Sequence, residues 1–447
     1  MSTNQFTKPI TAKVENNILT IGGCKTTELA EKYKTPLYVM DEESIRSVCK
    51  EYQNAFKKYN DKNPNKKLFR PLYASKALCV SALAKIISSE GFGFDTVSMG
   101  EIYTLYKSGI DMKTVLFNGN NKTPEELEFA LKVDIGRYSV DNFYEIDLLS
   151  ELTRKNNKKV NILLRITPGI ECHTHEYIKT GQIDSKFGFD LHQVDEAVEK
   201  ILEYSEYFNL KGIHAHIGSQ IFEDKCYYDE IEILIEEISR INKKYNLSLD
   251  EINIGGGLGV KYTKTDKPPA IEEIGNGIIN KIEECIKKYE TELPVIYIEP
   301  GRSIISTAGV TLYTIGSMKQ VLNGTKYVSV DGGMADNPRP SMYQAEYEAD
   351  IVTKMNTEKV EKVTIAGRFC ESGDILIKDI VLPKVEFGDI LCVYNTGAYN
   401  YSMASNYNSV EKPAMVLVNN SQSDMIINRE TLEDLISKQI IPDRLKG

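Results

Sequence analysis

The chain has 447 residues, of which 41% are hydrophobic and 26% are charged. These fractions exclude an intrinsically disordered chain and suffice for two or three domains, or for one large barrel with a smaller unit. The net charge of −10 disfavours a nucleic-acid-binding protein, because contacts with phosphates require clustered Lys and Arg.

The sequence has no apolar run of about 18 residues and no apolar stretch behind a basic start in residues 1–14. We therefore expect neither association with a membrane nor a secretory signal. Eight cysteines are scattered along the chain without a Cys-x-x-Cys pair. Because disulfides concentrate in small secreted domains, we expect reduced thiols and a cytoplasmic protein.

Short apolar runs, each predicted to be a strand, alternate with amphipathic segments in the first two thirds of the chain. The eight runs lie at residues 68–75, 92–98, 114–119, 134–140, 160–166, 210–218, 249–257 and 295–300. The segments predict helices at residues 80–89, 99–108, 124–132, 142–155, 195–207 and 228–245. Eight βα units in roughly 250 residues fit an α/β protein with a TIM barrel. A doubly wound open sheet is the alternative that the pattern leaves open.

The pattern changes after about residue 306. Strand-like runs at residues 309–318, 326–333, 362–370 and 389–399 lie between Gly, Asn and Pro turns, with few helical segments. This pattern is typical of a mostly antiparallel β domain. Residues 12–23 also have β character and could complete that domain.

A lysine stands at the end of the first predicted barrel strand, in the sequence Tyr-Ala-Ser-Lys that ends at Lys76. Active sites of TIM barrels lie at the carboxyl ends of the strands. A lysine there is either a surface residue or an amine that desolvation keeps neutral and able to form a Schiff base.

Two His-x-His pairs occur in the chain. The pair His214 and His216 ends the sixth predicted strand, where two rings on one face could bind a metal, although no third ligand is evident. The other interpretation is one structural and one functional histidine. The second pair, His173 and His175, lies in a polar segment and is expected to be exposed to solvent.

Two glycine-containing turns end the last two predicted barrel strands. The seventh strand ends in Gly255, Gly256 and Gly257, and the eighth in the sequence Glu299-Pro300-Gly301-Arg302. Loops after strands 7 and 8 often bind phosphate in TIM barrels, and glycines let the backbone N–H groups approach it. An amine, a phosphate cradle and a carboxylate together suggest the cofactor pyridoxal 5′-phosphate (PLP).

The motifs YASKA, HIGSQ, GGGLG, EPGR, DNPRP, CESGD and GAY, in this order, resemble those of the PLP-dependent, alanine-racemase-like barrel decarboxylases. Within that family they are most similar to the diaminopimelate decarboxylases, and CESGD and DGGMADNPRP are the most specific parts. The resemblance runs from residue 32 to about residue 435. It implies a barrel at residues 37–306, a β domain made of residues 1–36 and 307–447, and a homodimer with shared active sites.

The resemblance also implies roles for individual residues. Lys76 and Cys370 would be catalytic, Lys76 by attaching PLP and Cys370, from the partner chain, by protonating the product carbon. The residues implied in cofactor binding are Lys76, His216, Ser219, Gly255, Gly256, Gly257, Glu299, Pro300, Gly301, Arg302 and Tyr399. Those implied in substrate binding are Arg302, Arg339, Tyr343, Glu371 and Tyr399. Asp95 and Ser98 would support the cofactor indirectly, and no metal is expected.

The implied reaction is the decarboxylation of meso-2,6-diaminopimelate to L-lysine and CO₂, the last step of lysine synthesis. Three alternatives remain at this point. The chain could decarboxylate another basic amino acid, such as ornithine, arginine or carboxynorspermidine. It could bind PLP without catalysis. It could be a metal-dependent hydrolase that uses the His-x-His pairs, a class that metal analysis after dialysis would test.

Overall fold

The computed structural model describes residues 1–170, 185–322 and 324–446 and contains two compact units. The barrel unit comprises Met1–Gln5, Ile45–Lys261 and Asp266–Ile304. The β unit comprises Phe6–Ser44, Tyr262–Thr265 and Ile305–Gly447. Within the residues that the structure describes, no helix is both long and apolar enough to cross a membrane.

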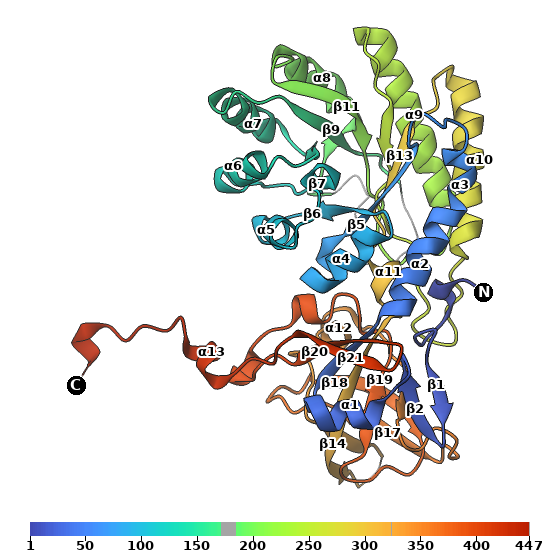
Figure 1. Cartoon of the computed structure of the whole chain (residues 1–447), viewed down its shortest axis with the longest axis vertical. Helices are drawn as coiled ribbons and strands as arrows, with labels where there is room; N and C mark the ends of the chain where they lie inside the picture. The colour runs from blue at the N-terminus through green and yellow to red at the C-terminus, as the bar shows by residue number, and fades with distance from the viewer. Residues whose placement is uncertain (171–184, 323, 447) are drawn as a thin grey trace. The chain divides into compact units, whose positions relative to one another are not determined.

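The barrel unit is built on a closed ring of eight parallel strands (Figure 1). In ring order these are β5 (Phe69–Ala74), β6 (Gly93–Thr96), β7 (Val115–Phe117), β8 (Arg137–Val140), β9 (Val160–Thr167), β11 (Phe208–His214), β12 (Glu251–Asn253) and β13 (Val295–Ile298). The pairing of β13 with β5 closes the ring, and the two-residue strand β10 (Phe189–Asp190) pairs with the end of β9. The predicted TIM barrel is confirmed, and the open sheet is wrong.

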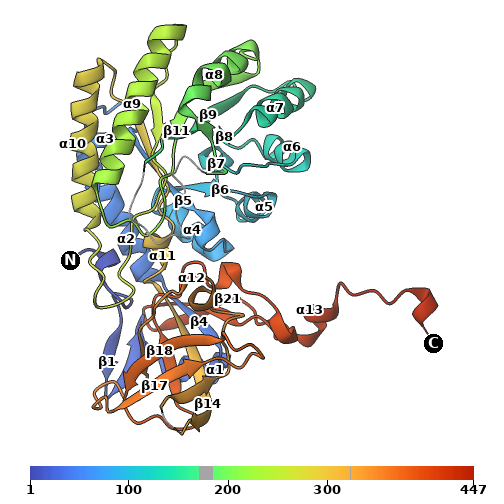
Figure 2. The same ribbon diagram turned by 180° about the vertical axis from the view of Figure 1, so that it is seen from behind.

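Helices surround this ring on the outside, as both views of the chain show (Figure 2). Those between residues 42 and 305 are α2 (Glu42–Ala55), α3 (Lys57–Asn60), α4 (Ser81–Ser89), α5 (Met99–Lys107), α6 (Pro124–Val133), α7 (Phe143–Lys155), α8 (Val194–Glu203), α9 (Lys225–Tyr245), α10 (Ile271–Tyr289) and α11 (Arg302–Ile305). Side chains fix several helix starts. The side chains of Ser98, Thr123 and Asn142 each accept from the N–H of the third residue of the helix that follows, in α5, α6 and α7 respectively.

The β unit contains two sheets. The small sheet is β1 (Lys13–Glu15), β2 (Ile18–Ile21) and β3 (Cys24–Lys25), followed by α1 (Thr26–Tyr33). The large sheet has the order β18 (Ile375–Leu382), β17 (Glu361–Ala366), β15 (Lys326–Val330), β14 (Gly309–Gln320), β4 (Leu37–Asp41), β20 (Ala414–Asn419) and β21 (Gln422–Ile427). β19 (Ile390–Val393) pairs with β14 and β16 (Ala349–Ile351), and the unit also holds α12 (Arg339–Tyr343) and α13 (Leu432–Ile436). Most pairings are antiparallel, as predicted.

The strand β4 lies in the middle of the large sheet of the β unit. Val39 pairs with Val310 on β14 and with Val416 on β20, and all three side chains are fully buried in one apolar cluster. Fully burying each valine stabilises the fold by roughly 1.5–3 kcal/mol. The implied start of the barrel, residue 37, therefore differs from the structure, in which the barrel unit resumes at Ile45 because β4 completes the other sheet.

Candidate active site

Lys76 follows β5 directly, in a short 3₁₀ turn formed by Ser75–Ala77, and its side chain is exposed. β5 lies between β13 and β6, so Lys76 stands beside the ends of both neighbouring strands. Its positive charge acts on two carboxyl groups there, Glu299 after β13 and Asp95 on β6. The sequence-predicted lysine and carboxylate thus meet at one mouth of the barrel.

Glu299 is buried and held by side-chain amides. Its Oε1 atom accepts from Asn253 Nδ2 at 2.7 Å and from Asn118 Nδ2 at 3.3 Å, and lies 3.5 Å from His214 Nε2. Burial raises the pKa of this carboxyl, and the nearby Asp95 carboxyl raises it further. The geometry gives a fixed acidic group inside the barrel that can share a proton with a basic nitrogen placed above it.

Asp95 and Ser98 lie around the end of β6 with distinct contacts. The buried Asp95 carboxylate accepts a hydrogen bond from Asn118, the amide that also reaches Glu299. Ser98 Oγ accepts from the backbone N–H of Glu101 at 3.3 Å and caps α5. Asp95 therefore belongs to the Glu299 network, whereas the contact of Ser98 is that of a helix cap.

The histidines of the sixth barrel strand have different surroundings. His214 is buried, its Nδ1 lies 2.7 Å from Ser139 Oγ, and burial lowers its pKa well below the usual value. His216 is half-buried, and its Nδ1 accepts from the N–H of Gly256 at 3.2 Å. Burial also lowers the pKa of His216, with a further contribution from Lys76. Both rings are therefore neutral, His214 within the barrel interior and His216 beside the glycine turn.

The structure does not support the metal site that the His-x-His pairs suggested. In the described ranges no group of three or more His, Cys, Asp or Glu residues could hold a metal ion. The second pair, His173 and His175, lies outside the described residues.

The glycine turn after β12 tolerates no side chain. A Cβ atom on Gly255 would lie 2.6 Å from His216 Nδ1, and one on Gly256 would lie 2.1 Å from the carbonyl oxygen of Glu299. Gly255 and Gly257 also have φ angles of +61° and +107°, which L-residues rarely adopt. The backbone is therefore bare at this turn, as a phosphate site requires.

Not every N–H group of the predicted cradle is available to a ligand. Gly255 N–H donates to Asn253 Oδ1 at 2.9 Å, and Gly256 N–H donates to His216. The N–H groups of Gly257 and Gly301 have no acceptor among the residues that the structure describes. Those two donors fit the phosphate of PLP, and the buried Glu299 fits its basic ring nitrogen.

Arg302 and Ser219 lie beside this cradle. The buried Arg302 guanidinium donates to Ser219 Oγ at 3.0 Å, which joins the eighth strand end to the loop after β11. The carbonyl oxygen of Pro300 accepts from Ala74 N–H at 3.2 Å and so holds the same turn against the β5 end. The predicted residues of the barrel unit therefore converge on one mouth.

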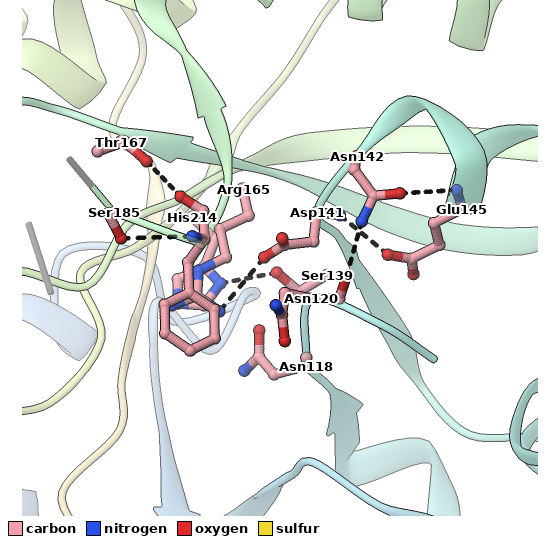
Figure 3. A network of polar contacts seen from close by, with 12 residues as sticks. Asn118, Asn120, Ser139, Asp141, Asn142, Glu145, Arg165, Thr167, Ser185 and His214 are labelled. Atoms are coloured by element: carbon pink, nitrogen blue, oxygen red, sulfur yellow. Dashed lines mark hydrogen bonds and ion pairs between the residues drawn. The ribbon is translucent and has the colours of Figure 1, made fainter. Parts of the chain in front are cut away.

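A polar network at the ends of β7, β8 and β9 was missed by the sequence analysis (Figure 3). The Lys122 ammonium pairs with Glu145 Oε1 at 2.7 Å, and both side chains are buried. Arg165 Nη1 lies 3.5 Å from Asp141 Oδ1, and its guanidinium stacks 4.5 Å from the ring centre of Phe187. The available signal was charge in apolar surroundings, such as Arg165 inside the run VNILLRI. Buried charges of this kind are usually paired.

In the β unit, Arg339 lies among three tyrosine rings. Its guanidinium carbon is 5.4 Å from the ring centre of Tyr343 and 5.8 Å from those of Tyr262 and Tyr399. The side chain is buried, yet its Nε–H has no hydrogen-bond partner among the described residues. A buried guanidinium with an unused donor fits a carboxylate ligand. The structure thus brings together Arg339 and Tyr343 on α12 with Tyr399 of the GAY motif.

Cys370 and Glu371 lie on an exposed turn between β17 and β18. The turn is held by Asp374, whose carboxylate accepts from the N–H groups of Phe369 at 2.8 Å and Met334 at 2.7 Å. The N–H of Cys370 donates to Asn408 Oδ1 at 2.9 Å. The CESGD motif therefore fixes the backbone while leaving the Cys370 and Glu371 side chains at the surface.

Comparison with known proteins agrees with this arrangement. The profile of the family "Pyridoxal-dependent decarboxylase, pyridoxal binding domain" matches residues 42–306. The diaminopimelate decarboxylase of Bacillus subtilis is 46% identical over 420 residues, 94% of each chain. That of Synechocystis is 44% identical over 453 residues, which covers 99% of this chain and 95% of the relative.

Solved structures lead to the same family. The diaminopimelate decarboxylase of Methanocaldococcus jannaschii in complex with L-lysine superposes with a TM-score of 0.92 at 36% identity and covers all of both chains. A lysine/ornithine decarboxylase of Vibrio vulnificus, at 20% identity and a TM-score of 0.74 over 88% of this chain and 97% of its own, shares the fold. The resemblance drawn from the motifs is confirmed, and the chain belongs to the diaminopimelate decarboxylase family of PLP-dependent decarboxylases.

Proposed function

We propose that this chain decarboxylates meso-2,6-diaminopimelate to L-lysine and CO₂ with PLP as cofactor. The observation that carries the proposal is the mouth of the barrel, where Lys76, the buried Glu299 and the bare glycine turn meet in a chain that is 46% identical to a diaminopimelate decarboxylase over 94% of its length. When bound, PLP supplies an electron sink for the bond that breaks on loss of CO₂.

The residues of the barrel unit divide the work of holding the cofactor. Lys76 supplies the amine for covalent attachment. Glu299, fixed by Asn253 and Asn118, holds a proton at the ring nitrogen and so keeps the ring able to accept electrons. Gly257 and Gly301 would donate to the phosphate, with the Ser219 hydroxyl as a further donor. The Tyr399 hydroxyl, which belongs to the β unit, is assigned to the phosphate as well. His216, held by the N–H of Gly256, would lie against the ring of bound PLP and set its tilt.

The residues of the β unit recognise the far end of the substrate. Diaminopimelate carries a second amino-acid group, so a site for it needs a cation for the carboxylate and an anion for the ammonium. Arg339 supplies a planar cation already enclosed by tyrosines, and the Tyr343 hydroxyl assists it. Glu371 supplies the anion. Because Arg302 donates to Ser219, we propose that its main role is to support the cofactor site and that binding the substrate is a secondary role.

We propose that the active enzyme is a homodimer with two shared sites. The Cys370 side chain is exposed on its turn, and a proton donor must come within about 3 Å of the carbon that it serves, directly or through one water. In the proposed dimer, Cys370 and Glu371 of one copy complete the barrel mouth of the other. The seven described cysteines are free thiols, which supports the cytoplasmic location expected from the sequence. The acidic composition supports a small-molecule enzyme rather than a nucleic-acid-binding protein.

Direct assay of products tests the proposed substrate. The purified protein with PLP is incubated separately with meso-diaminopimelate, ornithine, arginine and carboxynorspermidine, and both CO₂ and the amine product are measured. We expect release of lysine from diaminopimelate at a kcat/KM far above that for the other three. Preference for any of those three contradicts the substrate assignment. Binding of PLP with no turnover of any of them favours the non-catalytic alternative.

A further inference from the structure

Near its end the chain carries large aliphatic side chains that are exposed in the part of the chain that the structure describes. We call residues 431–446 the C-terminal arm; it contains α13 and runs away from the sheets of the β unit (Figures 1 and 2). Its exposed aliphatic side chains, each 59% to 87% accessible, are Leu432, Ile436, Ile440, Ile441 and Leu445. Five such side chains within 14 residues are a concentration of exposed apolar surface and not single scattered residues.

Local interactions do not account for an ordered arm. A capping box between Thr431 and Asp434 starts α13, but this helix has only five residues. Isolated helices shorter than about 12 residues are marginal in water, and most helical stability in proteins comes from packing an apolar face. The arm therefore needs a surface on which to pack.

Among its described residues, the barrel unit also carries an exposed apolar surface. Tyr103 and Tyr106 on α5 are each about half exposed, at 50% and 48%. Their rings lie 6.0 Å and 6.3 Å from that of Phe129 on α6, and Met99 at the start of α5 is exposed as well. We call Met99, Tyr103, Tyr106 and Phe129 the aromatic patch. Aromatic side chains and methionine are enriched at protein interfaces.

The charges around the two surfaces are complementary. The arm has Glu433 at its beginning and Lys438 and Arg444 towards its end, and none of these three side chains makes an ion pair in the described parts of the chain. Around the aromatic patch, Lys107 lies 5.6 Å from the ring centre of Tyr103, and Glu125 is exposed in the first turn of α6. Glu433 at the beginning of the arm is thus opposite in charge to Lys107, and Lys438 and Arg444 towards its end are opposite in charge to Glu125.

We propose that the C-terminal arm of one copy of this chain docks on the aromatic patch of a second copy. The proposal rests on the dimer proposed above and adds a contact to it. Both surfaces belong to the same chain, so a dimer with two-fold symmetry forms the contact twice and covers both copies of each surface. The arm then acts as a clasp that holds the two chains of the shared active sites together.

Photochemical cross-linking between isotopically distinct copies tests the contact. Ile441 is replaced by the photoreactive residue p-benzoylphenylalanine, and ¹⁵N-labelled and unlabelled proteins are allowed to exchange subunits before irradiation. We expect cross-linked peptides that join residue 441 of one isotope to residues 99–133 of the other. As a matched control, the same residue at position 387, where Phe387 is 81% exposed in the β unit, gives no such product.

The outcomes separate the arm from the dimer. Cross-links confined to one isotope, or to segments outside α5 and α6, overturn the docking proposal while the dimer stands. A protein that sediments as a monomer at micromolar concentration overturns the proposed dimer and the docking proposal with it.

Paired substitutions measure the strength of the contact. We expect Ile440→Ser with Ile441→Ser, and separately Tyr103→Ser with Tyr106→Ser, to raise the dimer dissociation constant by about ten-fold or more. Since both pairs remove the same contact, the combined variant should have an effect close to that of either pair alone. Phe387→Ser serves as the control and leaves the constant unchanged. Independent, multiplicative effects of the two pairs contradict the docking proposal.

Discussion

The two groups of residues assigned to the active site differ in how they are presented. At the barrel mouth, Glu299 is enclosed and held by Asn253 and Asn118. On the β unit, Cys370 and Glu371 stand exposed on a turn whose backbone Asp374 fixes. The first arrangement is organised for its ligand within one chain. The second is an exposed surface that becomes a site only when another surface meets it, and the difference favours an enzyme assembled from two copies.

The largest effect tests the barrel side of this comparison. We expect Lys76→Ala to abolish decarboxylation and the borohydride-fixed attachment of PLP to the protein, because no other amine stands at the end of β5. Peptide mass spectrometry after reduction locates the attachment. As the control we use Lys85→Ala, which removes an exposed lysine on α4 and should leave both decarboxylation and PLP attachment unchanged. A reduced lysine adduct elsewhere in Lys76→Ala would place the attachment at another residue.

The second prediction tests whether the two sides come from different chains. Lys76→Ala and Cys370→Ala are each expected to be inactive, but their hybrid dimer has one site with both residues intact. After random exchange half of the dimers are hybrids with one working site in two, so about a quarter of wild-type activity returns. Mass tagging measures the exchange itself. A mixture that exchanges and remains inactive would show that each site is built within one chain.

The third prediction concerns Arg339, the buried arginine of the β unit. Arg339→Ala should weaken binding of diaminopimelate by about 10–150-fold, because a lost charged hydrogen-bond partner costs roughly 1.5–3 kcal/mol. Binding of PLP should change little, as measured by its absorbance on titration. Arg154→Ala, an exposed arginine on α7, leaves both affinities unchanged. Equal losses for diaminopimelate and for cadaverine, a diamine that has the same five-carbon spacing but no carboxylate, would remove the assigned role of Arg339.

The sequence predicted the barrel well because its strands and capped helices are local patterns. Lys76 and Glu299 could be placed at one mouth because carboxyl ends of parallel strands share an edge. The network of Lys122, Glu145, Arg165 and Asp141 could not be placed in this way. Its ion pairs depend on side chains 23 or 24 residues apart whose direction the pattern does not give.

For the fold as well, local pattern did not give a long-range pairing, as the position of β4 shows. The run LYVMD reads as a buried strand in either sheet, and only its pairing with β14, some 270 residues later, decides between them. The glycine turn gives a further case. Four glycines in five residues predicted a bare backbone, but not that Gly255 and Gly256 donate to Asn253 and His216.

The last and smallest expected effect concerns Asp336, a buried carboxyl of the β unit outside the proposed active site. Its proton should make the stability of the protein depend on pH. Asp336 follows the DGG turn, and its carboxylate accepts from Gly333 N–H at 2.8 Å and from the Tyr313 hydroxyl. Burial raises the pKa of Asp336 to about 7, above its ordinary 3.8. The native protein therefore holds a proton that the unfolded chain releases above about pH 4, and the stability that this proton contributes is lost as the pH rises towards 7.

We expect the free energy of unfolding to lose about 2–3 kcal/mol between pH 5 and pH 8 through this group, and Asp336→Asn to remove that loss. Urea titrations at both pH values measure it. Asp350→Asn is the matched control: burial acts to raise the pKa of Asp350, but Lys8 and Lys359 hold it below its usual value, so it is ionised at both pH values. Its removal therefore lowers stability equally at pH 5 and pH 8. If the free energy of unfolding of Asp336→Asn depends on pH as that of the wild type does, the proton is not held by Asp336. The buried carboxyls of the barrel mouth, above all Glu299, would then account for the pH dependence.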